Sequence, residues 1–547
     1  MKEKKSILNN KGYLYLTEFF SGMAVMAVEL GANRLLAPYF SSSQIVWTIV
    51  IGTIMIAMAL GNLYGGRSAD KHPDPDRLYR RILVAAVWIA AIPLVGKYLI
   101  ICITGLLVIS VNTGFLIWAA LASCMVIFVF PLFLLGTVTP SLVKYTIGNL
   151  SESGSVVGRL GAANTIGSIL GTFLPTFVTI PAVGTAVTFL LFSGVLLLLA
   201  VVYFLSEKRH YAGCIIAVIL YLLCALFGSS SHFAFWENDL TYEGESVYNY
   251  LQVREEADSI ILSTNVLFGV QSVHMKNEGL TGMYYDYATA APLMASIPAE
   301  GSAKDPAGST EGDGGPRMLI LGMGTGTYPT MCGRYFPSIE AEGVEIDEKI
   351  TDLAHTYFYL DEKIPVVTYD GRAYLAAVEG TYDIIMVDAY RDITIPFQMS
   401  SIEFFRLVRE HLAPGGVLVM NMNMYSEEEG SITDYLSDTV AAVFPYVYTA
   451  DVPWTTNREL FASENENMLK DMEEGISSIA DGELRAFWER HVSEITPYTK
   501  GNYLLTDDKA PVEVLGMRVI DGLIREELGY YKEIYEEEGI RGLIESF

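Results

Sequence analysis

The hydrophobic and polar positions divide this chain into two parts of different character. As far as about residue 230, long apolar runs are separated by short polar turns. As helices, these runs are long enough to cross a hydrocarbon core of about 30 Å. The pattern predicts a transmembrane helical bundle over residues 13–230, after a short N-terminal segment of residues 1–12. About seven spans are expected, at residues 13–37, 44–64, 82–111, 113–140, 160–181, 183–205 and 211–229.

After residue 240 the pattern changes to short alternating strands, which predict a small antiparallel β domain over residues 240–298. A polar stretch containing glycine and proline follows at 299–316 and predicts a flexible linker. Beyond it, apolar strands alternate with helical segments as far as "GVLVMNMN". This alternation predicts a Rossmann-like α/β domain with a parallel sheet over residues 317–547, ending in acidic helices.

Two acidic residues lie inside the first predicted span. Glu18 and Glu29 are eleven residues apart and therefore share one face of a helix. Ionisable groups at membrane depth are costly and need a partner or water. The sequence leaves two interpretations open. One is a path or seat for a cationic amine, and the other is structural pairing with Arg34, Arg67 or Asn62.

The fifth predicted span carries glycines spaced for close helix packing. Gly161, Gly167 and Gly171 lie in the segment "GRLGAANTIGSILGTFLP". Small residues four apart let two helix backbones approach each other in lipid. We therefore expect this span to pack tightly against a neighbouring helix.

Composition and charge limit the class of function. The chain has 547 residues, is 51% hydrophobic and carries a formal net charge of −27, which fits a membrane part joined to an acidic globular part. An acidic surface disfavours nucleic acid as a partner and favours cationic ligands. Four of the five cysteines lie in apolar runs, and the spacing predicts neither a disulfide framework nor a metal site.

A glycine-rich turn follows the first strand of the predicted parallel sheet. Gly322, Gly324 and Gly326 would let the backbone approach a ligand closely. Glu345 closes the second strand, where a carboxylate can accept hydrogen bonds from ribose hydroxyls. The third glycine of the dinucleotide fingerprint is missing, and Asp370 ends the third strand. S-adenosylmethionine or a relative of it therefore fits better than NAD.

Several motifs together resemble one known family. "ESVYNYLQV" (245–253), "GVQS", "YYDYATAAPLMA" (284–295), "LGMGTG", "VEID", "YDGRAYL" and "YDIIMVDAY" occur in the order in which spermidine synthases carry their motifs. "LTDDKAPVE" (505–513) and "ELGANRLLAPYF" (29–40) are similar to segments of the membrane-fused members. The chain thus resembles the membrane-fused spermidine synthase-like, or polyamine aminopropyltransferase, family.

The resemblance implies aminopropyl transfer from decarboxylated S-adenosylmethionine to a polyamine amine, with 5'-methylthioadenosine leaving and without a metal. It also suggests a homodimer. It implies catalytic roles for Asp388, Asp392 and Tyr284. The donor-binding residues that it implies are Gly322, Gly324, Thr325, Gly326, Glu345, Asp370, Gly371, Gln271 and Asn249. The acceptor-binding residues that it implies are Tyr285, Asp286, Gln398 and Asp507.

The chain departs from the family pattern at several of these positions. Thr325 stands where the glycine loop of the family carries an aspartate. Tyr285 and Asp286 replace a histidine and a glutamate. In "DAYRDITIP", Asp388 is followed by Asp392 one residue later than the second acid of the family. Attack by an amine on the donor carbon needs a carboxylate that takes the proton, and these two aspartates can still supply it.

Two other functions remain open at this stage. Without the loop aspartate, the glycine turn also resembles that of an S-adenosylmethionine-dependent methyltransferase. A transporter or sensor whose nucleoside domain binds without turnover is the third possibility. The released product separates the three hypotheses, because only aminopropyl transfer yields methylthioadenosine.

The side of the membrane on which the globular part lies is a further expectation. The lysines of residues 1–12 place the N-terminus in the cytoplasm, and the basic loops at 65–81 and 206–210 fit the same side. Seven crossings would then put the globular part outside. A hairpin at Gly96–Tyr98, or a segment 211–229 that does not cross, would change this count. We expect a multi-pass cell-membrane protein with a cytoplasmic globular domain, because its nucleoside donor is cytosolic.

Overall fold

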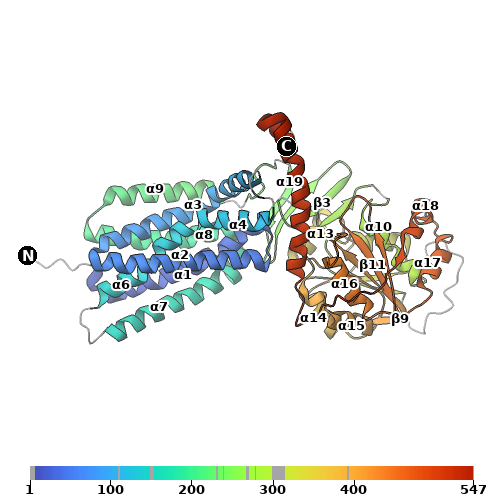
Figure 1. Ribbon diagram of the computed structural model, residues 1–547. Helices are drawn as coiled ribbons and strands as arrows, with labels where there is room; N and C mark the ends of the chain where they lie inside the picture. The colour runs from blue at the N-terminus through green and yellow to red at the C-terminus, as the bar shows by residue number, and fades with distance from the viewer. Residues whose placement is uncertain are drawn as a thin grey trace, which may run out of the picture. The chain divides into compact units, whose positions relative to one another are not determined.

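The chain forms two compact units, shown in Figure 1. One unit holds Met1–Glu237 together with residues 265–267 and Glu527–Phe547, and the other holds the rest of Asn238–Glu526. The computed structural model describes residues 7–108, 111, 113–147, 153–229, 232–237, 239–266, 270–277, 279–297, 315–390 and 394–545.

The first unit is a bundle of helices that lie side by side (Figure 1). Among the described residues, five stretches are long and apolar enough to cross a membrane, and the last of them, Ser153–Glu207, holds two helices. The second of these helices has a kink near its start at Gly184, whose φ of 78° is not helical. The helices are α1 (Lys11–Phe40), α2 (Gln44–Lys71), α3 (Pro75–Val108), α4 (Phe115–Ile127), α5 (Val129–Gly136), α6 (Val138–Thr146), α7 (Ser153–Leu174), α8 (Ile180–Glu207) and α9 (Tyr211–Phe227), with a 3-10 turn η1 (Ile7–Asn9) and a π-helical segment η3 (Pro175–Thr179).

A helix lies at each of the seven predicted spans, although the ends differ by several residues. α3 runs without interruption through Gly96–Tyr98. The alternative of a hairpin at this point is therefore wrong, because a glycine in an apolar helix does not by itself break it. α4 and α9 are apolar but shorter than the other spans.

Glycines hold α1 and α7 in direct backbone contact. A Cβ atom added to Gly167 would lie 1.9 Å from the carbonyl oxygen of Phe19, and one added to Gly171 would lie 2.1 Å from that of Met23. Neither position has room for a side chain. A Cβ at Gly161 meets nothing within 4 Å among the described residues. The predicted packing is thus confirmed for two glycines and wrong for Gly161, which faces away from α1.

Glu18 is fully buried at this same helix contact. Its Oε1 accepts hydrogen bonds from Thr139 Oγ1 at 2.5 Å and from Asn164 Nδ2 at 2.9 Å. The partners come from α6 and α7, so the predicted pairing of Glu18 with Arg34, Arg67 or Asn62 is wrong. Close packing at the α7 glycines brings Asn164 within hydrogen-bonding distance of Glu18. The positions of charged residues along the sequence do not predict this contact.

The second unit contains two sheets. The first has the order β1-β2-β3-β4, and all its neighbours are antiparallel. Its strands are β1 (Leu240–Glu245), β2 (Tyr250–Glu255), β3 (Ser259–Ser263) and β4 (Ser272–Met275). This is the predicted small β structure with one additional strand, β1.

The second sheet has eight strands in the order β12-β10-β11-β9-β8-β5-β6-β7. β5 to β9 are parallel, and β10, β11 and β12 join antiparallel. The chain winds from β5 to β7 in one direction and continues at β8 on the other side of β5. In such a sheet, ligands bind at the carboxyl ends of the strands where the winding reverses. The strands are β5 (Arg317–Leu321), β6 (Glu340–Glu345), β7 (Val366–Thr368), β8 (Tyr382–Val387), β9 (Leu412–Met422), β10 (Tyr446–Asp451), β11 (Arg458–Ser463) and β12 (Thr496–Pro497).

Helices cover both faces of this sheet (Figure 1). α10, α11, α12, α17 and α18 share one continuous hydrophobic core with apolar side chains of β5, β8, β9 and β11. The helices that follow the small sheet in the chain are α10 (Tyr284–Ala288), α11 (Ala290–Met294), α12 (Thr327–Tyr335), α13 (Glu348–Tyr357), α14 (Gly371–Ala377), α15 (Ile402–Glu410), α16 (Ile432–Ala441), α17 (Met468–Ile476) and α18 (Gly482–His491), with 3-10 turns η4 (Phe397–Met399) and η5 (Val492–Glu494). The last helix, α19 (Val512–Glu545), continues beyond Glu526, the last residue of this unit.

Candidate active site

The glycine turn between β5 and α12 lies against the carboxyl end of β8. Gly322, Gly324 and Gly326 have φ values of 93°, 54° and 79°, a region that other residues adopt with strain. A Cβ atom at Gly322 would lie 2.5 Å from the carbonyl oxygen of Asp388. Glycine is therefore required both for the turn and for its contact with the strand that carries the candidate base.

Glu345 ends β6 beside this turn. It is 7% exposed, and its carboxylate accepts hydrogen bonds from the backbone N–H groups of Gly324 and Asp347, both at 3.0 Å. Burial raises the pKa of Glu345 to about 7, in spite of these hydrogen bonds. Each carboxylate oxygen has two lone pairs, so Glu345 can hold the turn and still accept bonds from ribose hydroxyls.

Two other residues that were predicted to bind the aminopropyl donor have hydrogen bonds of their own. Asn249 donates to Asp347 Oδ2 at 3.0 Å. Asp370 caps α14, which begins at Gly371, by accepting from the N–H of Ala373 at 2.9 Å.

Two further residues that were predicted to bind the aminopropyl donor, Gln271 and Thr325, lie beside β4. Gln271 precedes β4, is partly buried and pairs its backbone N–H with the carbonyl of Leu262 at 2.8 Å. Thr325 is buried, and its hydroxyl lies 3.3 Å from that of Thr327. The threonine is thus accommodated inside the fold, and the glycine loop presents no carboxylate at this position.

Asp388 directly follows β8 and forms the centre of the site. Its Oδ2 accepts a hydrogen bond from the Tyr284 hydroxyl at 2.5 Å, and its Oδ1 accepts one from Asn421 Nδ2 at 3.0 Å. Burial raises the pKa of Asp388 to about 7, against the effect of both hydrogen bonds. A carboxyl with this pKa exchanges its proton near neutral pH, which is what a general base requires.

The groups around Asp388 are fixed by their own contacts. The rings of Tyr284 and Tyr285 lie 4.0 Å apart between centroids. Burial raises the pKa of both tyrosines, that of Tyr285 to about 12, so both hydroxyls stay protonated. Asn457 Nδ2 donates to Asn421 Oδ1 at 2.8 Å and thereby sets the orientation of the amide that holds Asp388.

Three predicted acceptor residues have other contacts in the structure. Asp286 accepts hydrogen bonds from Thr281 and from the N–H of Gly282, and so fixes the turn before α10. Asp507 forms a two-pronged ion pair with Arg372, with both N–O distances at 2.7 Å.

The same Arg372 side chain donates to the backbone carbonyl of Gln398 at 2.8 Å. None of the hydrogen bonds described for these residues joins them to Asp388, and their roles in acceptor binding stay predictions. Asp392, the other predicted catalytic acid, lies outside the described residues.

Two residues at the centre were missed in the sequence. Asn421 lies in "VMNMN" at the end of β9, where a polar residue closing an apolar strand was a usable signal. Glu459 lies in β11, directly opposite Asn421. The sequence indicates Glu459 only through its spacing of two residues from Phe461, which is buried. This spacing places both side chains on one face of the sheet only if the segment is known to be a strand.

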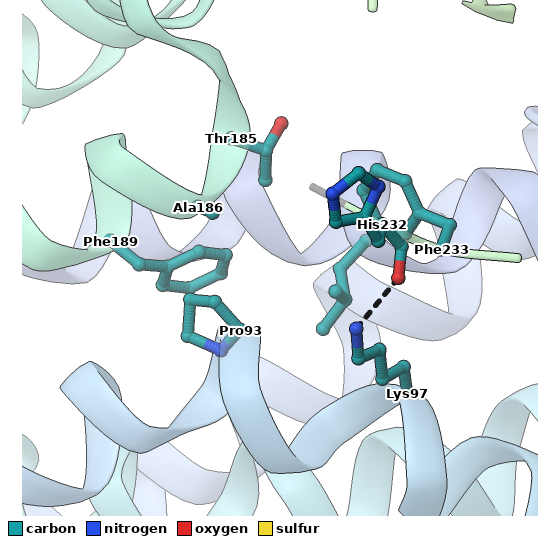
Figure 2. A pocket seen from close by; sticks show the side chains of 8 residues that line it. Pro93, Lys97, Thr185, Ala186, Phe189, His232 and Phe233 are labelled. Atoms are coloured by element: carbon teal, nitrogen blue, oxygen red, sulfur yellow. Dashed lines mark hydrogen bonds between the residues drawn. The ribbon is translucent and has the colours of Figure 1, made fainter. Parts of the chain in front are cut away.

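A small hollow in the helical unit does not resemble a site for a cationic amine. Figure 2 shows Lys97 reaching the backbone carbonyl of His232, to which its Nζ donates at 2.7 Å. A positive charge at the wall of the hollow repels another cation. The lining residues are Leu35, Pro93, Lys97, Thr185, Ala186, Phe189, His232 and Phe233.

Comparisons with known proteins show to which family the chain belongs. The profile of the family described as spermine/spermidine synthase domain matches residues 314–471. A probable polyamine aminopropyl transferase from Bifidobacterium longum (strain NCC 2705) is 49% identical over 360 residues, which cover 63% of this chain and 77% of that protein. The chain therefore belongs to the spermidine synthase, or polyamine aminopropyltransferase, family, and it is a transferase.

More distant similarities extend to two other proteins. The crystal structure of spermidine synthase from Thermotoga maritima covers 47% of this chain and 84% of its own, at 19% identity and a TM-score of 0.37. The human eEF1A lysine and N-terminal methyltransferase is 27% identical over 158 residues, which cover 26% of this chain and 22% of that protein. The methyltransferase similarity thus concerns a limited part of either chain.

Proposed function

We propose that this protein transfers an aminopropyl group from decarboxylated S-adenosylmethionine to an amine of a polyamine. The observation that carries the proposal is the buried Tyr284–Asp388 pair, which lies beside a glycine turn and Glu345 at the reversal point of the sheet. The turn and Glu345 are suited to hold the nucleoside part of the donor. Asp388 is suited to take a proton from the amine.

The proposed reaction is a single displacement. The amine nitrogen attacks the aminopropyl carbon bound to the sulfonium sulfur, and a new C–N bond forms as the C–S bond breaks. The sulfur keeps the electron pair of the broken bond and leaves as 5'-methylthioadenosine. The proton lost by the amine passes to Asp388, while Tyr284 and Asn421 hold the two carboxylate oxygens in place. No metal is needed for these steps, because the sulfonium is already an activated leaving group.

The helical unit is proposed to anchor the enzyme in the cell membrane. Five stretches of sufficient length and apolar composition support this proposal. The globular unit would lie in the cytoplasm, where a nucleoside donor is available. The basic residues of the loop at 65–81 are consistent with a cytoplasmic side for the end of α2.

Methyl transfer is the second candidate, since Thr325 replaces the acid that a family member carries in its glycine loop. One experiment separates the two reactions. The purified full-length protein is incubated with S-adenosylmethionine, with its decarboxylated form and with a mixture of polyamines, and the nucleoside products are identified by mass spectrometry. Methylthioadenosine formed only from the decarboxylated donor supports the proposal. S-adenosylhomocysteine as the product would replace it by methyl transfer, and the absence of any product would contradict both.

A further inference from the structure

Glu459 is a buried acid that the proposed mechanism does not use. It is 0% exposed, and neither of its carboxylate oxygens has a hydrogen-bond partner in the part of the chain that the structure describes. A buried carboxyl without donors is expensive in free energy. A buried acid without a partner at the centre of the candidate active site is therefore expected to have a function.

The strand register places Glu459 in one row with the reaction centre. Glu459 on β11 pairs with Asn421 on β9, and Asn421 donates to Asp388 at the end of β8. Side chains that are directly opposite each other on neighbouring strands point to the same face of a sheet. Asp388, Asn421 and Glu459 therefore project from the same face, the one covered by α10 and α12. Burial and the nearby charge of Asp388 both raise the pKa of Glu459 above its usual range.

The polar neighbours of Glu459 are already engaged elsewhere. The Tyr328 hydroxyl donates to the carbonyl of Ala288 at 3.0 Å, and the Tyr390 hydroxyl donates to the carbonyl of Asn421 at 2.6 Å. The side-chain amide of Asn421 is used by Asp388 and Asn457. A ligand that carries hydrogen-bond donors would satisfy the carboxylate oxygens of Glu459. An ammonium group has three donors and no acceptor, and its charge matches that of an ionised carboxylate.

The distance across the row suits a short diamine. Two strand spacings of about 4.8 Å separate the backbones at Asp388 and Glu459, so their Cα atoms lie about 10 Å apart. The two side chains shorten this gap from either end. A diamine with a short alkyl chain can therefore place one nitrogen at each carboxyl group.

On the basis of the proposed function, we propose that Glu459 binds the non-reacting ammonium of a diamine acceptor whose other nitrogen is held at Asp388. The ionised carboxylate of Glu459 then pairs with the ammonium, and a proton that the carboxyl carries in the free protein passes to solvent.

The test compares a diamine with a monoamine of the same length, 1,4-diaminobutane and butylamine, in the full-length protein. Only the diamine can use Glu459. We expect wild-type kcat/KM to favour the diamine by at least about tenfold, the usual effect of a charge-assisted hydrogen bond. Glu459→Gln keeps the shape and removes the charge. It should lower kcat/KM for the diamine by about 10- to 100-fold through KM, and leave the monoamine and the donor affinity unchanged.

Glu464→Gln is the matched control, because this exposed residue lies on the same segment and pairs only loosely with Arg409, at 3.9 Å. It should behave as wild type. An unchanged ratio of diamine to monoamine in Glu459→Gln overturns the inference, and so does an equal loss with both amines, which indicates a structural role. If Glu459→Gln does not fold, the wild-type ratio decides, and a ratio near one overturns the inference. If neither amine is aminopropylated, the proposed function fails and this inference fails with it.

Discussion

Asp388 is the residue on which the proposed chemistry depends. Asp388→Asn keeps the size of the side chain and can still contact Tyr284, but it removes the group that takes the proton. We expect turnover to fall by about 10²–10⁴, while donor affinity changes little. Steady-state kinetics of methylthioadenosine release and calorimetric titration with the donor measure the two quantities separately.

Glu362→Gln serves as the control for this substitution, because Glu362 is exposed and lies in the segment between α13 and β7. It should retain wild-type turnover and donor affinity. If Asp388→Asn were as active as wild type, the amine would have to lose its proton to another group, and the proposed role of Asp388 would be wrong.

Glu345 predicts how donor binding depends on pH. Its pKa is about 7, so it is ionised above that pH and protonated below it. A protonated carboxyl accepts hydrogen bonds from ribose hydroxyls less well. Donor affinity should therefore fall as the pH decreases through about 7, by about tenfold between pH 8 and pH 6 if only the ionised form binds.

Titration calorimetry at several pH values measures this dependence. In Glu345→Gln the affinity should be lower and nearly independent of pH, because the titrating group is gone. Glu345→Ala also removes the hydrogen bonds and should weaken donor binding by about tenfold or more. Binding that is unaffected by either substitution would show that the ribose contacts another residue.

The residues of the site differ in how far the sequence could predict them. The glycine turn, Glu345 and Asp388 could be predicted from short local patterns in the sequence. In each case an apolar strand is followed directly by a glycine turn or ends at an acid. Glu459 depends on the register between β9 and β11, which the sequence does not state. Asp286 was assigned by motif position, and the motif did not reveal that its carboxylate is held by the turn at 281–282.

At the scale of elements, the contact between α1 and α7 gives a test with an internal control. Gly167→Ala places a methyl group against the carbonyl oxygen of Phe19, so the two helices must move apart. Overpacking of this kind typically costs about 1–3 kcal/mol. Gly161→Ala, on the same helix, meets open space and should stabilise slightly, by about 0.5–1 kcal/mol, because alanine favours a helix.

Thermal unfolding of the full-length protein in detergent measures both variants. The expected result is a lower midpoint for Gly167→Ala and an equal or higher midpoint for Gly161→Ala. Equal effects of the two substitutions would mean that the α1–α7 contact does not contribute to stability in the way the backbone distances indicate.

The elements themselves were predictable where periodicity is strong. β5 to β9 and their helices follow the predicted alternation, since each is a compact apolar segment followed by a turn signal. β10, β11 and β12 were not predicted. They join the sheet antiparallel in succession: β11 pairs with β9, β10 with β11 and β12 with β10, and these long-range pairings do not follow from the local sequence pattern.

At the scale of the whole molecule, an apolar helical unit and an acidic enzyme unit are joined in one chain. A membrane-bound transferase meets its soluble donor only if the globular unit lies on the side where that donor is made. The seven predicted spans, counted as simple crossings from a cytoplasmic N-terminus, point to the opposite side. Since α3 is continuous, a hairpin in α3 does not change the number of membrane crossings. The side of the globular unit then depends on whether α9 crosses the membrane.

Cysteine labelling tests which side is correct. Cys102 is an exposed native cysteine, so Cys102→Ala is the background, into which Glu362→Cys is introduced on the globular unit and His72→Cys in the basic loop after α2. Both positions are exposed. We expect a membrane-impermeant maleimide to react with both only after the cytoplasmic side has been opened, because the proposed donor is a cytosolic nucleoside and basic loops favour the cytoplasmic side. If Glu362→Cys reacts in intact cells while His72→Cys stays protected, the globular unit is outside, α9 crosses the membrane, and the donor must reach the enzyme from outside the cell.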